Sequence, residues 1–179
     1  MPIGVVDEGR QRLAGALAWP VLADPRSGLR YPGAGVVVCA ADGILRAPEF
    51  AAAHRPDIVL ALGERWASKV VTAFVAGSPR VVVDPTGSWP DPERSAGHLV
   101  RCDPTLLCEA LAAAAVAARA APRSTTWASA WADAERAALD AILAAVDNDY
   151  HYQNGSETDT PGPPGARSAT PRRTGGSAG

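Results

Sequence analysis

Short apolar runs recur along residues 1–146, separated by segments with a helical pattern. They cover residues 19–24, 57–63, 80–85 and 98–103, with a weaker candidate at 35–39. Runs that are apolar throughout, and rich in Val, Ile and Leu, are typical of parallel strands buried on both faces of a sheet. We therefore predict a strand in each of these positions.

The segments between the runs predict helices. Residues 68–75 fit a short helix, and an aspartate followed by proline at 103–104 is typical of an N-cap and first helical turn, opening a helix to about Arg119. A last helix begins near Thr125, because large apolar residues recur at helical spacing from there to Val146. This alternation predicts an α/β fold with a doubly wound, mainly parallel, Rossmann-like sheet.

The composition changes after Val146. Residues 147–179 contain no Val, Ile, Leu, Met or Phe and are rich in Gly, Pro, Ser and Thr, so we expect a disordered tail that cannot bury enough apolar surface to order itself. Residues 1–146 then form one domain. A Rossmann-like unit opens with a strong strand, and residues 3–6 make a weak one, so we expect this domain to be truncated and incomplete at its N-terminus.

Charge and cysteine content narrow the function classes. The net charge is −2 and the basic residues are scattered, which disfavours nucleic acid or an anionic membrane as a partner. The cysteines show no C-x-x-C spacing. There is no secretory signal pattern, and the apolar runs are shorter than the ~20 residues of a membrane span. We expect a soluble, cytoplasmic protein.

Most catalytic motifs are absent from the sequence. The three histidines are far apart, and neither a G-x-S-x-G nor a Walker A motif occurs. Residues 33–35 resemble the start of a dinucleotide-binding loop, but Val38 stands where the third glycine belongs, and no strand precedes the loop. A flexible turn is the favoured interpretation there.

Loops that follow strands are the better candidates, because ligands of doubly wound folds bind at the carboxyl ends of strands. Lys69 lies just after such a loop and is the only lysine, against sixteen arginines. It could offer a compact cation to a carboxylate or phosphate, or be an ordinary surface lysine. The arginines of loop 24–30 could bind anions or simply be solvated. Trp89, in loop 84–92, could cover a ligand, pack on the domain or contact a subunit.

One segment carries a family resemblance. Residues 19–30, WPVLADPRSGLR, look like the W-P-x-x-A-D-x-x-S-x-x-R region of actinobacterial SEPHCHC synthases (2-succinyl-5-enolpyruvyl-6-hydroxy-3-cyclohexene-1-carboxylate synthases). Further resemblances lie in residues 42–46, where Ala41 replaces the family's tyrosine, in 56–63 with Ser68 and Lys69, and in 127–145. Together they cover about residues 15–146 and match the central domain of these enzymes.

The resemblance implies that this chain is a fragment of a transferase of menaquinone biosynthesis. That enzyme adds the succinyl group of 2-oxoglutarate to isochorismate. Such enzymes form homo-oligomers and use thiamine diphosphate and Mg²⁺, bound by their outer domains. The central domain is mainly structural, but a basic residue at the position of Lys69 contacts a substrate carboxylate. The cofactor-binding G-D-G motif is absent here, and the only asparagines are Asn148 and Asn154.

We therefore expect this chain to bind no cofactor or metal in the family's manner, to contain no catalytic residue and to be inactive alone. Two alternatives stay open. The chain could be a stand-alone nucleotide- or flavin-binding module, or a structural remnant that associates with separate thiamine-diphosphate-binding domains.

Overall fold

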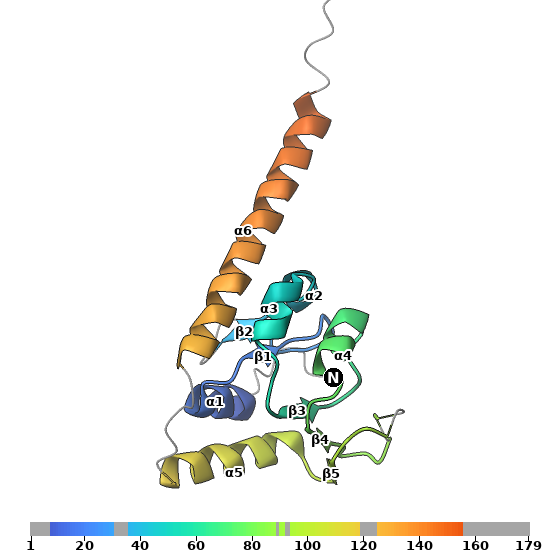
Figure 1. Ribbon diagram of the computed structural model, residues 1–179, viewed down its shortest axis with the longest axis vertical. Helices are drawn as coiled ribbons and strands as arrows, with labels where there is room; N and C mark the ends of the chain where they lie inside the picture. The colour runs from blue at the N-terminus through green and yellow to red at the C-terminus, as the bar shows by residue number, and fades with distance from the viewer. Residues whose placement is uncertain (1–7, 31–35, 89, 92–93, 119–124, 156–179) are drawn as a thin grey trace, which may run out of the picture. The chain divides into compact units, whose positions relative to one another are not determined.

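The computed structural model describes residues 8–30, 36–88, 90–91, 94–118 and 125–155 (Figure 1). The chain divides into two compact units, residues 1–142 and 143–179, and each is described by itself. The elements, in chain order, are α1 (Glu8–Leu17), β1 (Val21–Leu22), β2 (Val37–Val38), α2 (Ala41–Ile44), α3 (Pro48–Ala53), β3 (Val59–Leu62), α4 (Lys69–Val75), β4 (Arg80–Val83), β5 (His98–Val100), α5 (Pro104–Ala117) and α6 (Thr125–Gly155).

The predicted strands are all present, and every strand pair is parallel. β1 pairs with β2, and a second ladder has the order β3-β4-β5. In its register Val59 lies opposite Arg80 and Leu62 opposite Val83. The prediction of a parallel α/β fold is confirmed, with the strands of the described residues divided between two ladders.

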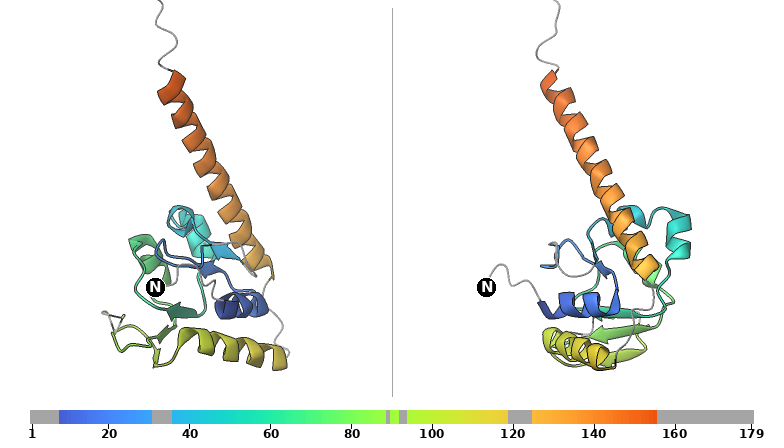
Figure 2. Two further views of the ribbon diagram at one scale, coloured as in Figure 1. Left: turned by 180° about the vertical axis from the view of Figure 1, so that it is seen from behind. Right: turned by 90° about the vertical axis from the view of Figure 1, so that its left-hand side faces the viewer.

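Side chains alternate between the two faces of β3, as they must in any strand. Val59 packs on a cluster that includes Phe74 of α4 and Trp131 of α6, whereas Leu60 and Leu62 pack on a cluster formed by α1 and α5. Figure 2 shows α1 and α5 side by side. Helices therefore cover both faces of β3, which confirms the doubly wound arrangement.

Trp131 is the centre of the larger cluster. It is 1% exposed and lies edge-on to Phe50, Phe74 and Trp127. Glu135, one turn further along α6, is also buried and accepts hydrogen bonds from the backbone N–H groups of Cys39 and Ala40 at 2.9 and 3.0 Å. These contacts dock the first part of α6 onto the segment after β2, with Trp127 and Trp131 packed in the same cluster.

The predicted end of the last helix at Val146 is wrong, because α6 continues to Gly155. Residues 147–155 lack aliphatic side chains, but a helix that is already nucleated gains one backbone hydrogen bond for each added residue.

Three further predictions lie outside the described residues: the tail beyond residue 155, the weak strand at 3–6 and the turn at 33–35. The helix predicted to reach about Arg119 ends at Ala117, with Ala118 as its C-cap. Within the described part of the chain, the helices are too short or too polar to cross a membrane.

Candidate functional site at the strand ends

Two loops meet where β1 and β3 end. Asp24 follows β1, and its carboxylate accepts a hydrogen bond of 2.7 Å from the backbone N–H of Ala67, in the loop that follows β3. Arg26 reaches the same loop and donates to the carbonyl oxygen of Arg65. The structure thus brings together loops 24–30 and 63–68, which the sequence placed separately at strand ends.

The charged side chains of loop 24–30 already have hydrogen-bond partners within the domain. The guanidinium of Arg26 donates to Asp24 at 2.9 Å and, as the largest effect, lowers the pKa of Asp24 to about 2. Desolvation opposes this shift, and the backbone N–H groups of Ala67 and Arg26 add to it. Arg30 donates to the carbonyl oxygen of Cys39 at 3.2 Å. Both arginines of loop 24–30 therefore hold the loop in place rather than pointing at an open anion site.

Ser68 connects α4 to α2. Its hydroxyl oxygen caps α4 by accepting from the backbone N–H of Val71 at 3.1 Å, and its proton is donated to Asp42. Asp42 also accepts two hydrogen bonds from Arg46, at 2.9 and 3.0 Å. The hydrogen bonds from Ser68 and Arg46 lower the pKa of Asp42. The carboxylate is therefore committed to its own neighbours.

Lys69 is the first residue of α4, and its side chain is exposed. Among the residues that the structure describes, no ion pair of Lys69 is found, whereas Arg26 and Arg46 each have a carboxylate partner. The first turn of α4 carries no acidic residue. A cation at this end of a helix is unfavourable to the helix dipole, so helix stability does not account for Lys69.

A cavity of about 320 Å³ lies beside this group of loops. It is lined by the Ala23–Pro25 turn, Cys39, Asp42 and the segment Trp66–Ser68. Burial is the main cause of a raised pKa for the Cys39 thiol, which keeps the sulfur protonated and a weak nucleophile. The cavity therefore offers binding surface but no activated nucleophile.

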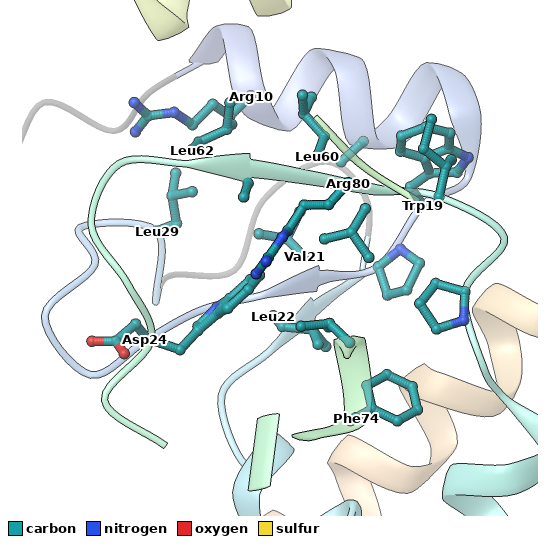
Figure 3. Close-up of a pocket in the computed structure, with 18 of the residues that line it drawn as sticks. Arg10, Trp19, Val21, Leu22, Asp24, Leu29, Leu60, Leu62, Phe74 and Arg80 are labelled. Atoms are coloured by element: carbon teal, nitrogen blue, oxygen red, sulfur yellow. The ribbon is translucent and has the colours of Figure 1, made fainter. Parts of the chain in front are cut away.

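A larger cavity of about 660 Å³ lies between β1 and β3 (Figure 3). Its walls are largely apolar and include Val21, Leu22 and all of β3. Arg80, which also lines it, is held in an ion pair with Asp91 at 2.9 Å. Asp24 lines it as well and is likewise held in an ion pair, with Arg26.

The loop after β4 is organised by Asp84, which sequence reasoning missed. This carboxylate is 1% exposed and accepts from the backbone N–H groups of Thr86, Gly87 and Ser88 at 3.1, 2.8 and 3.2 Å. Gly87 has a positive φ of 77°, which favours glycine. The signal was the Asp-Pro-Thr-Gly turn itself, typical of an aspartate that binds its own backbone. Trp89 lies outside the described residues.

No group of three His, Cys, Asp or Glu side chains in the described part of the chain could hold a metal ion. His54 stacks on Phe50, with ring centroids 3.9 Å apart, and its Nδ1 lies 2.8 Å from the Phe50 carbonyl oxygen. The residues described here do not fit Mg²⁺ with a diphosphate, and we derive no chemical step through thiamine diphosphate for this chain.

Parallel strands covered by helices on both faces, with loops meeting at the strand ends, define a doubly wound α/β domain. No family model matches the chain. Curated relatives do match it: 2-succinyl-5-enolpyruvyl-6-hydroxy-3-cyclohexene-1-carboxylate synthase of Sorangium cellulosum is 41% identical over 117 residues, 60% of this chain and 19% of that enzyme. The enzymes of the same name from Halobacterium salinarum and Bacillus velezensis are 37% and 33% identical over 117 and 107 residues, 63% and 57% of this chain and 19% and 18% of those enzymes.

These relatives agree with the resemblance to SEPHCHC synthases that residues 19–30 predicted, and the chain is similar to one segment of those enzymes. It spans about a fifth of the length of the curated relatives it matches.

Proposed function

We propose that residues 1–146 act as the central α/β domain of a SEPHCHC synthase and have no synthase activity alone. The 41% identity to the Sorangium cellulosum enzyme, confined to one segment of it, carries this proposal. The doubly wound fold supports it. Thiamine diphosphate, Mg²⁺, 2-oxoglutarate and isochorismate would be bound in the assembled cytoplasmic homo-oligomer, with the cofactor held by the outer domains.

Lys69 is the residue of this domain that we assign to the substrate site. Three observations support the assignment: it is exposed, it lies at the strand ends where ligands of this fold bind, and it has no ion pair among the described residues. An unpaired ammonium can pair with a substrate carboxylate without first breaking an internal ion pair. The two nearby arginines cannot replace it, because both are engaged with their own loop.

Co-expression of the full chain with the outer domains of the Sorangium cellulosum synthase tests the domain assignment. We expect the three parts to co-purify and to consume 2-oxoglutarate and isochorismate, while the chain alone and the outer domains alone are inactive. Absence of both co-purification and activity, with all parts folded, would refute the assignment.

The Lys69 assignment is tested in the active assembly. Lys69→Ala is expected to lower kcat/KM by about tenfold to a hundredfold, the usual loss for a hydrogen bond to a charged group. Lys69→Arg keeps the charge and should lose less. Arg136→Ala is the matched control, since it removes an exposed cation whose ion-pair partner, Asp133, is also exposed. Unchanged kinetics for Lys69→Ala would refute the role of Lys69 and leave the domain assignment standing.

A further inference from the structure

The backbone that carries Lys69 is anchored by two other elements of the fold. Asp24, in the loop after β1, accepts a hydrogen bond of 2.7 Å from the backbone N–H of Ala67. Asp42, in α2, accepts a hydrogen bond from the hydroxyl of Ser68. The two residues directly before Lys69 are therefore each held by a carboxylate from a distant part of the chain.

The hydrogen bond from Ser68 to Asp42 is more than the end of a helix requires. An N-cap hydroxyl needs only to accept from the backbone, and Ser68 does so from Val71 at 3.1 Å. Its proton could equally be donated to water. Donation to Asp42, 26 residues away in the chain, fixes the direction of the hydroxyl and ties the first turn of α4 to α2.

Helix α2 is a firm support for this hydrogen bond. Ala41 and Ile44 are buried and pack in the same cluster as Val71 of α4, and the two helices are in contact (Figure 1). The carboxylate of Asp42 is itself fixed by two hydrogen bonds from Arg46, at 2.9 and 3.0 Å. It therefore has a set position relative to the start of α4.

The anchoring carboxylates do not compete for the ammonium of Lys69. Asp42 forms its ion pair with Arg46, and Asp24 forms its ion pair with Arg26. In the part of the chain that the structure describes, neither carboxylate forms an ion pair with Lys69. The two anchors thus hold the backbone before the lysine and leave its charge available to a ligand.

We propose that Asp42 is a positioning residue for Lys69: through Ser68 it fixes the backbone from which the lysine reaches a substrate carboxylate. This inference rests on the role of Lys69 proposed above. The ammonium of lysine stands on a flexible four-carbon stem, so the fold directs it mainly by placing its backbone. Groups that meet a substrate must be held within about 0.5 Å of the productive position, and a displacement of about 1 Å can cost a hundredfold in rate.

Kinetics of the active assembly test whether Asp42 acts through Lys69. Asp42→Ala is expected to lower kcat/KM by about three- to tenfold, less than Lys69→Ala, because the lysine is displaced and not removed. In the Lys69→Ala background, Asp42→Ala should cause no further loss, because the group that it positions is gone. An equal loss in both backgrounds would show that Asp42 only stabilises the domain, and would overturn the proposal.

Two further variants test whether the hydrogen bond to Ser68 is the cause. Asp42→Asn keeps an acceptor for the hydroxyl and should retain most of the activity that Asp42→Ala loses. Glu8→Gln is the matched control, since Glu8 also forms an exposed i,i+4 ion pair with an arginine, and it should leave kcat/KM unchanged. Activity as low in Asp42→Asn as in Asp42→Ala would overturn the role of this hydrogen bond.

The kinetics distinguish a failure of the positioning role from a failure of the Lys69 assignment. A loss for Lys69→Ala without any loss for Asp42→Ala would overturn the positioning role of Asp42 alone. Unchanged kinetics for Lys69→Ala would refute the substrate role of Lys69 and, with it, the positioning role that rests on it.

Amide hydrogen exchange of the full chain tests the same link without a reaction. Without Asp42, the hydroxyl of Ser68 has no fixed direction, so its hydrogen bond from the Val71 amide weakens. That amide should exchange about two- to tenfold faster in Asp42→Ala, the effect of losing one hydrogen bond, and should keep its protection in Asp42→Asn. Unchanged exchange of the Val71 amide in Asp42→Ala would overturn the proposal.

Discussion

Asp24 is the residue that joins the loops after β1 and β3. Its pKa of about 2, against an ordinary value of 3.8, arises chiefly from the Arg26 hydrogen bond. Because the pKa of Asp24 is lowered in the folded state, this carboxylate binds more protons in the unfolded chain than in the folded one at pH values between about 2 and 3.8. The stabilisation by the carboxylate is therefore fully present above about pH 4 and is lost as the pH falls toward 2.

We predict that Asp24→Asn lowers the free energy of unfolding above pH 4 by roughly 1–2 kcal/mol, discounted for screening by solvent because Arg26 is largely exposed. The difference from the unsubstituted chain should shrink toward zero as the pH falls from 4 to 2. Urea unfolding at several pH values measures it. Asp133→Asn, in an ion pair that is two-thirds exposed on both sides, should show little effect. A pH-independent Asp24→Asn effect would contradict this account.

At the residue scale, the sequence singled out Lys69 as a candidate site residue but did not indicate the carboxylates that organise the loops. Lys69 is conspicuous because it is the only lysine and follows a predicted strand. The partner of Asp24, Ala67, is 43 residues away in the chain, and the partners of Glu135 are 95 and 96 residues away. A carboxylate's role depends on which backbone N–H groups the fold brings to it, and no local pattern encodes that.

At the scale of the element, the N-cap of α5 is the clearest local signal. Asp103 accepts from the backbone N–H groups of Thr105 and Leu106 at 2.8 and 3.0 Å, ahead of Pro104 in the first turn. We predict that Asp103→Ala destabilises the chain by about 1 kcal/mol, whereas Asp103→Asn, an equally good cap, costs much less. Urea midpoints of the two variants measure the difference, and equal losses would show that the cap is not the cause.

The same element scale explains which helices the sequence missed. The helices α4, α5 and α6 were predicted because they carry caps or large apolar residues at helical spacing. Helices α2 and α3 have alanines at their N-caps with no side-chain hydrogen bond, and α2 has only four residues. Helix α1 buries Gly9 and Ala14 beside Leu13, so small residues fill much of its buried face. Close packing through small side chains leaves little hydrophobic periodicity to detect.

At the scale of the whole molecule, the larger cavity decides between a structural domain and a nucleotide- or flavin-binding module. A nucleotide site needs polar groups that are free to bind the ligand, whereas the walls of this cavity are largely apolar and its Asp24 and Arg80 are held in ion pairs with Arg26 and Asp91. We therefore predict that flavin and adenine nucleotides leave the melting temperature of the full chain unchanged.

The shift in melting temperature expected from a bound nucleotide is large enough to test this prediction clearly. A ligand present at 100 times its Kd stabilises the folded state by ~2.7 kcal/mol, which raises the melting temperature of a domain of this size by about 5–10 °C. A shift of that size with any one nucleotide would establish the binding module and contradict the assignment of a structural domain. Without such a shift, the function of this domain is expected at its strand-end loops, where Lys69 lies.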